Sequence, residues 1–113
     1  MRSIPQKMKE KLTVILTEFR HYLEALYGER LDRIVLYGSQ ARGDANSESD
    51  IDVLIVLKEP FNYSDETERV SFIVTPLCLE HNVVISCAFM TLQQLKQGNS
   101  AFFRNVHLEG ISV

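Results

Sequence analysis

The chain has 113 residues, of which 45% are hydrophobic, and its formal net charge is −3. This length predicts one domain, residues 1–113, with a core of its own, and the acidic balance argues against direct nucleic-acid binding, which needs a basic patch. No apolar run approaches the roughly 20 residues that cross a membrane, and the mixed-charge start lacks a signal-peptide pattern. We therefore expect a cytoplasmic protein without membrane contacts.

The first half of the chain predicts a helix and two strands. Apolar residues at three- and four-residue spacing indicate an amphipathic helix from about Pro5 to Tyr27. The β-rich segment Leu31 to Tyr37 indicates a buried strand. Ser39 to Arg42 is expected to form one helical turn, which Gly43 ends. After a polar loop, the apolar run Ile51 to Leu57 indicates a second buried strand.

The second half continues the alternation of helices and strands. Asn62 to Asp65 offers N-cap residues for a helix to about His81. Val70 to Thr75 alone could be a strand, but the segment length and the apolar spacing favour a helix, kinked near Pro76. The order of elements predicts an α/β (α+β) fold, in which helices flank a small sheet. The remaining expected elements are a strand from Val83 to Met90, a helix from Thr91 to Gln97, a helix from Ser100 to Glu109 with Phe102, Phe103 and Val106 facing inward, and an extended piece from Ile111 to Val113.

Two aspartates open the second strand, shortly after a glycine-rich turn. Asp50 and Asp52 occupy alternate positions, so their side chains project to the same face of the strand. Close carboxylates repel one another unless a cation lies between them, and Mg²⁺ binds carboxylates together with phosphate oxygens. The turn from Gly38 to Gly43 opens into a helix N-terminus, which favours phosphate. These residues together predict a metal–nucleotide site.

The order Gly-Ser-x-Ala-x-Gly (Gly38 to Gly43) and then Ser-Asp-x-Asp (Ser49 to Asp52) resembles the motif of the nucleotidyltransferase fold in the polymerase-beta superfamily. The short chain resembles the minimal members of that superfamily, the MNT proteins. These are commonly the antitoxins of MNT–HEPN (MntA–HepT type) toxin–antitoxin pairs. The helix–strand–motif–strand order and the final Glu109-Gly110-Ile111 extend the resemblance over most of the chain. The resemblance implies a small mixed sheet flanked by helices.

The resemblance also implies a role for each residue of the turn. Gly38 would let the backbone approach a triphosphate, because it has no Cβ. Ser39 would bind a phosphate oxygen, and Gly43 would close the turn. Arg42 could reach phosphate or a neighbouring acid, with a surface position or an ion pair to Asp44 as the alternatives.

Asp50 and Asp52 would be the catalytic pair and would hold one or two Mg²⁺ ions. The resemblance implies ATP or another NTP as substrate, transfer of the nucleoside monophosphate to a hydroxyl, and release of pyrophosphate. It implies a tyrosine of a HEPN toxin as the acceptor. No residue that reads the base is identifiable, so the nucleotide stays open. A chain this short has no second domain for a large acceptor, so a partner would bring the acceptor to the site.

The sequence lacks one acid of the family pattern, the third carboxylate. Active members usually add a third carboxylate from a later strand, and the expected third strand contains no acid. Asn82 and Ser86 are the positions where one could have stood, and Glu80 lies just before the strand. Asparagine is a weak neutral ligand and cannot act as a base. Two alternatives therefore stay open: a weak or inactive module that neutralises a HEPN toxin by direct binding, and an isolated nucleotide sensor.

Overall fold

The computed structural model describes residues 2–3, 10–43 and 50–113. The beginning of the first expected helix at Pro5 and the expected polar loop at 45–49 lie outside these residues. No helix in the described ranges combines the length and the apolar character that a membrane span requires. The strands are β1 (Arg2–Ser3), β2 (Leu31–Tyr37), β3 (Ile51–Leu57), β4 (Ile85–Thr91) and β5 (Ile111–Ser112). The helices are α1 (Glu10–Tyr27), α2 (Gly38–Arg42), α3 (Tyr63–His81), α4 (Leu92–Gln97) and α5 (Ala101–Glu109), with a 3₁₀ turn at Gly28–Arg30.

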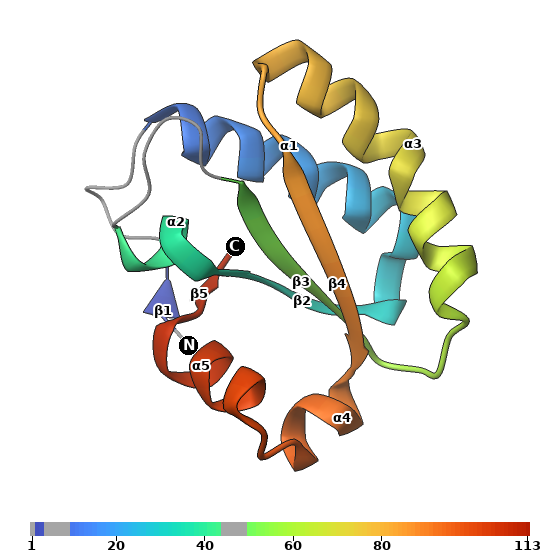
Figure 1. Cartoon of the computed structure of the whole chain (residues 1–113). Coiled ribbons are helices and arrows are strands. Elements are labelled where there is room, and N and C mark those ends of the chain that lie inside the picture. The colour runs from blue at the N-terminus through green and yellow to red at the C-terminus, as the bar shows by residue number, and fades with distance from the viewer. Residues whose placement is uncertain (1, 4–9, 44–49) are drawn as a thin grey trace.

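The strands form one mixed sheet in the order β1-β5-β2-β3-β4 (Figure 1). β2 pairs antiparallel with β3 and with β5, whereas β3 and β4 are parallel, as are β1 and β5. The small mixed sheet flanked by helices is therefore confirmed. The last residues were expected only to be extended. They form the strand β5, which pairs with β2 on the side away from β3. β1 was not expected, because two residues carry no periodicity that a sequence could reveal.

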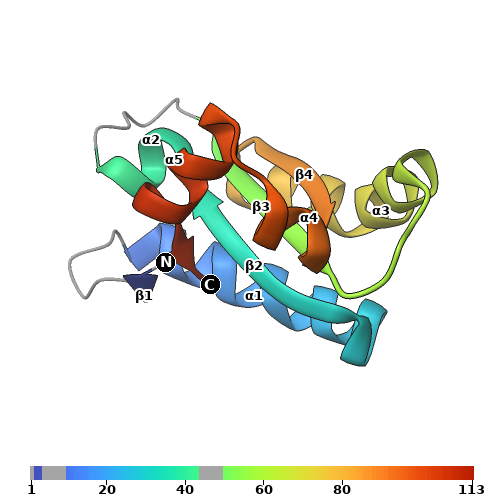
Figure 2. The same ribbon diagram turned by 90° about the horizontal axis from the view of Figure 1, so that it is seen from below.

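Apolar side chains fill both faces of the sheet. α1 and α3 cover one face, and α4 and α5 cover the other (Figure 2). In β3, Val53 and Ile55 belong to the first core, while Leu54 and Val56 belong to the second. A strand that is buried on both faces reads as a continuous apolar run, which is why its bounds could be predicted. Because alternate residues share a face, Asp52 lies on the same face as Leu54 and Val56, the face of α4 and α5.

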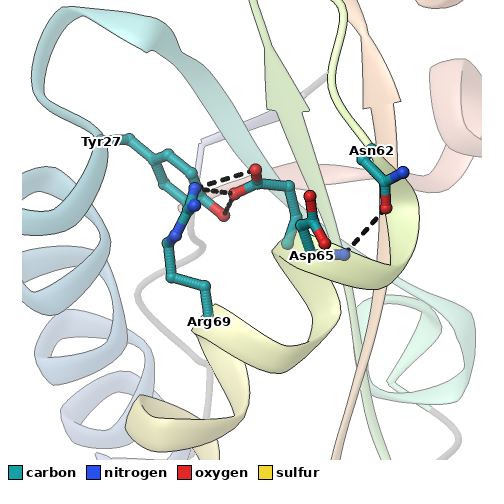
Figure 3. A network of polar contacts seen from close by, with 5 residues as sticks. Tyr27, Asn62, Asp65 and Arg69 are labelled. Atoms are coloured by element: carbon teal, nitrogen blue, oxygen red, sulfur yellow. Dashed lines mark hydrogen bonds and ion pairs between the residues drawn. The ribbon is translucent and has the colours of Figure 1, made fainter.

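Local capping sets the ends of the later helices. The Asn62 side chain accepts a hydrogen bond from the backbone N–H of Asp65 at 3.0 Å and so begins α3 (Figure 3). α3 continues to His81 and includes Pro76, so the segment that could have been a strand is helical. Thr91 begins α4 through a capping box with Gln94, as its position predicted.

A buried polar network joins α1 to α3. Glu66 is only 4% exposed, and its carboxylate accepts a hydrogen bond from the Tyr27 hydroxyl at 2.7 Å. The guanidinium of Arg69 donates to both oxygens of the same carboxylate, at 2.8 and 2.9 Å (Figure 3). A buried carboxylate without partners would cost several kcal/mol, on the order given by transfer data. These contacts therefore hold the end of α1 against the start of α3.

One expected orientation in α5 was wrong. Val106 is fully buried and Phe103 is half-buried, but Phe102 is 38% exposed. The buried stripe of a helix spans little more than 100°, and Phe102 lies at its edge, where the ring packs against Tyr37 and leaves part of its surface open.

Candidate functional site

The turn between β2 and α2 lies directly against an aspartate. Tyr37, the last residue of β2, pairs with Asp52 across the antiparallel ladder. The next residue, Gly38, has a φ of +75°, in the left-handed region that favours glycine. A Cβ added at Gly38 would lie 2.4 Å from Oδ2 of Asp52, too close for any real contact. The backbone conformation therefore favours glycine here, and any larger residue would push the Asp52 carboxylate out of its position.

The rest of the turn forms the single helical turn that the sequence predicted. Ser39 is half-buried in α2, and its carbonyl accepts a hydrogen bond from the N–H of Gly43 at 3.0 Å. Gly43 has a φ of +81° and ends α2 in the left-handed conformation. Arg42 occupies the last turn of α2, and its Nη1 lies 3.4 Å from Oε2 of Glu109 in α5. Its expected alternative partner, Asp44, lies outside the described residues.

Asp50, Asp52 and Ser86 meet at the adjoining ends of β3 and β4. The parallel register places Asp52 opposite Ser86, and the Ser86 hydroxyl donates a hydrogen bond to Oδ2 of Asp50 at 3.4 Å. Asp50 is exposed, whereas Asp52 is half-buried. Burial raises the pKa of Asp52, the like charge of Asp50 raises it further, and the positive charge of Arg42 opposes both effects.

The three candidates for a third site residue lie in different surroundings. Ser86 contacts Asp50, as described above. Asn82 has a φ of 54° and ends α3 in the left-handed conformation. Glu80 belongs to a separate group on α1 and α3, where its carboxylate, that of Glu18 and a ring nitrogen of His81 lie within 4.8 Å of one another. The register of the sheet thus singles out Ser86, which no sequence argument could do.

The donor atoms of this site suit a hard divalent cation. Asp50 and Asp52 present carboxylate oxygens at the start of β3, and Ser86 adds a hydroxyl oxygen. Mg²⁺ prefers such oxygen ligands and is usually bound by one or two carboxylates together with substrate phosphates. Burial and then the like charge of Asp50 raise the pKa of Asp52, and a bound dication would relieve the repulsion between the two carboxylates. The residues therefore fit Mg²⁺.

Tyr37 is a residue of this region that the sequence analysis did not single out. It shares a face with Asp52, and burial together with the nearby Asp52 charge raises the pKa of its hydroxyl. Its ring centroid lies 5.4 Å from that of Phe102, with the two planes at 85°. The one feature of the sequence that could have indicated a role for Tyr37 is its position directly before Gly38.

Comparison with known proteins assigns the family. The family model described as "Nucleotidyltransferase domain" matches residues 16–109. The chain belongs to this nucleotidyltransferase family. It is 41% identical over 97 residues to a Methanocaldococcus jannaschii protein named "Putative protein adenylyltransferase MJ0604", an alignment that covers 84% of this chain and 90% of that protein. A second protein of the same organism, "Putative protein adenylyltransferase MJ0141", is 38% identical over 72 residues, which cover 64% of this chain and 72% of that one.

Solved nucleotidyltransferase structures share the fold. A crystal structure of a toxin–antitoxin with AMP-PNP aligns with a TM-score of 0.59 at 16% identity, covering 92% of this chain and 72% of the other. A structure described as a "putative minimal nucleotidyltransferase" aligns with a TM-score of 0.58 at 20% identity, covering 95% of this chain and 99% of the other. At these identities the likeness concerns the fold.

Proposed function

We propose that this nucleotidyltransferase moves a nucleoside monophosphate, AMP from ATP, to a hydroxyl of a partner protein and releases pyrophosphate. The observation that carries the proposal is that Asp50, directly before β3, and Asp52, within β3, lie together beside Ser86, with the Gly38 turn against Asp52. The names of the two archaeal relatives support adenylyl transfer to a protein. The toxin–antitoxin neighbour supports a toxin as the partner, and the MNT resemblance supports a tyrosine of a HEPN toxin as the acceptor.

Each residue of the turn has a task in this proposal. The backbone N–H groups of Gly38 and Ser39, with the Ser39 hydroxyl, bind phosphate oxygens, and Gly43 closes the turn around them. Arg42 ends the same turn and is close enough to Asp52 to influence its pKa, so its guanidinium can reach a phosphate oxygen at the same site.

Asp50 and Asp52 hold Mg²⁺ in the proposal. When bound, the ion supplies charge neutralisation of the triphosphate and of the departing pyrophosphate. The aspartates and the turn orient the α-phosphorus, and such positioning accounts for most of the catalysis in phosphoryl-type transfer. Ser86 is not a base at neutral pH, so the proton of the acceptor hydroxyl passes to one of the two aspartates or to solvent.

A second candidate function rests on Ser86 itself. Its hydroxyl occupies the position opposite Asp52, where a third carboxylate would complete the family pattern. A chain without that acid can keep the fold and the nucleotide and neutralise its toxin by binding alone. This candidate predicts a stable complex and no covalent change on the partner.

The two candidates are separated by intact mass spectrometry. The chain is mixed with Mg²⁺, ATP and the product of the adjacent gene, and both masses are measured. Transfer adds one AMP to the partner, and the increment disappears with Asp50→Asn and with Asp52→Asn. Glu80→Gln serves as the matched control, because Glu80 lies in the group with Glu18 and His81 and its loss leaves the increment. A tight complex without any increment, for every common NTP, would refute transfer and support the binding module.

A further inference from the structure

An exposed aromatic ring packs against Tyr37, the strand partner of Asp52. Phe102 is 38% exposed and packs edge-to-face on Tyr37, which pairs with Asp52 in the sheet. We propose that Phe102, held by Tyr37, is the residue on which the base of the nucleotide stacks. The inference rests on the proposed function, since it requires a triphosphate bound between the Gly38 turn and Asp52.

One side chain, that of Tyr37, connects the Phe102 ring to Asp52. Directly opposed residues in an antiparallel pair have Cβ atoms about 5 Å apart, so the Tyr37 side chain stands beside that of Asp52. The Phe102 ring follows on the same face, with its centroid 5.4 Å from that of Tyr37. Tyr37 therefore links Asp52 to the Phe102 ring, and a ribose that extends past Tyr37 would bring the base to that ring.

Two neighbouring rings hold Phe102 in a defined orientation. Tyr37 contacts it with the ring planes at 85°, and Phe103 contacts it at a centroid distance of 6.0 Å with the planes at 77°. Phe103 in turn packs on Gly98, where an added Cβ would lie 2.3 Å from the ring. These edge-to-face contacts fix the orientation of the Phe102 ring and leave part of its surface exposed to solvent. A fixed open ring is the element that stacks bases in nucleic-acid-binding proteins.

α5 connects this ring to the phosphate-binding turn. Phe102 stands near the start of α5 and Glu109 at its end, where Glu109 pairs with Arg42 of α2 at 3.4 Å. Figure 2 shows α5 beside α2. α5 therefore positions both the Phe102 ring and Glu109, the partner of Arg42. A nucleotide with its base on Phe102 and its phosphates at the turn would need both ends of α5 to be held in place.

The chemistry of the ring favours a base over the other parts of the ligand. Phe102 has no charge or hydrogen-bonding group to offer a phosphate or a ribose. Every base has a π-face, so stacking contributes affinity but little choice between bases. The proposal therefore predicts similar losses for ATP and GTP when the ring is removed.

Titration calorimetry tests the proposal with Mg²⁺–ATP and with Mg²⁺–tripolyphosphate, which lacks the base. Loss of one stacking contact is worth about 1–3 kcal/mol, or roughly a 5- to 150-fold change in Kd. Phe102→Ala is expected to weaken ATP binding by such a factor and to leave tripolyphosphate binding unchanged. Phe102→Leu keeps the apolar volume and is expected to lose ATP affinity likewise, while Phe102→Trp retains it. Phe72→Ala is the control, because Phe72 is 75% exposed on α3, which covers the opposite face of the sheet.

Four results would overturn the inference. An unchanged Kd for ATP in Phe102→Ala and Phe102→Leu would show that the ring does not stack the base. Equal loss of ATP and tripolyphosphate affinity would show a general disturbance of the site. Unchanged ATP binding with slower transfer to the partner would assign the ring to the acceptor. If the unaltered chain binds neither ligand with Mg²⁺, the proposed function fails as well, and this outcome is recognised before any variant is made.

Discussion

Gly38 and Asp52 lie so close that a Cβ on the glycine would come within 2.4 Å of the carboxylate oxygen Oδ2. The contact joins the end of β2 to the start of β3, two segments between which the chain runs through α2 and through residues 44–49, which lie outside the described residues. It brings the backbone of the turn proposed to bind phosphate and a proposed metal ligand into one site. Any side chain at position 38 must displace one or the other.

Gly38→Ala is therefore expected to abolish nucleotide binding and transfer. The substitution adds a clash with Asp52 to the strain of a φ of +75°. Gly28→Ala is the matched control, because Gly28 also has a positive φ, of +56°, has no atom within 4 Å of the added Cβ and lies outside the turn. It should lose roughly 1–2 kcal/mol of stability and still bind ATP in a calorimetric titration. Equal ATP affinity in the two variants would contradict the role assigned to the close contact.

Ser86→Asp places a third carboxylate opposite Asp52 and next to Asp50. Three like charges repel one another, so we expect a lower melting temperature in EDTA and a larger rise on adding Mg²⁺ than the unaltered chain shows. If the missing acid limits catalysis, the rate of AMP transfer also rises. Asn82→Asp adds the same charge at the end of α3 and should give neither effect. A Mg²⁺ response of Ser86→Asp no larger than that of the unaltered chain would contradict the assignment of the metal site.

Arg42 and Glu109 form an ion pair whose side chains are 45% and 37% exposed. Exposed pairs contribute only about 0–1 kcal/mol, so Glu109→Gln should change the free energy of unfolding in urea by no more than that. Arg42→Ala should also weaken ATP binding, by roughly 10-fold for one charge-assisted contact. Glu109→Gln should leave ATP binding intact. Equal ATP affinity in Arg42→Ala and in the unaltered chain would exclude a phosphate contact for Arg42.

Tyr27→Phe tests the network between α1 and α3. The substitution removes the hydroxyl donor of buried Glu66, and we expect a loss of about 1–3 kcal/mol in the free energy of unfolding at neutral pH. Tyr22→Phe is the control, because Tyr22 is 53% exposed, and its effect should lie within about 0.5 kcal/mol.

The same network predicts that the free energy of unfolding depends on pH. Burial, and then the hydrogen bond to Glu66, raises the pKa of Tyr27 above the ordinary value near 10. A raised pKa means that the stability from the neutral hydroxyl is complete below about pH 10 and is lost as the pH rises above it toward the folded-state pKa. Urea unfolding between pH 8 and pH 11 should show this loss in the unaltered chain and a smaller one in Tyr27→Phe. Parallel pH profiles would contradict the account.

The bounds of β2 and β3 could be predicted to the residue, as could the end of α3 at His81. These features depend on local chemistry, namely apolar runs that stop at turn residues and side chains that cap helices. β4 was expected from Val83 but begins at Ile85, because pairing with β3 and not propensity decides where a strand starts. β1 and β5 have two residues each and exist only through their partners.

By itself, the sequence determined that Asp50 and Asp52 share a face and that Gly38 to Gly43 forms a turn ahead of them. Both follow from short-range geometry, the two-residue period of a strand and the backbone freedom of glycine. Only the tertiary structure decided that Ser86 stands opposite Asp52 and that Phe102 packs against Tyr37. Those positions depend on the register between β3 and β4 and on how α5 packs, and packing between distant segments leaves no periodic trace in the chain.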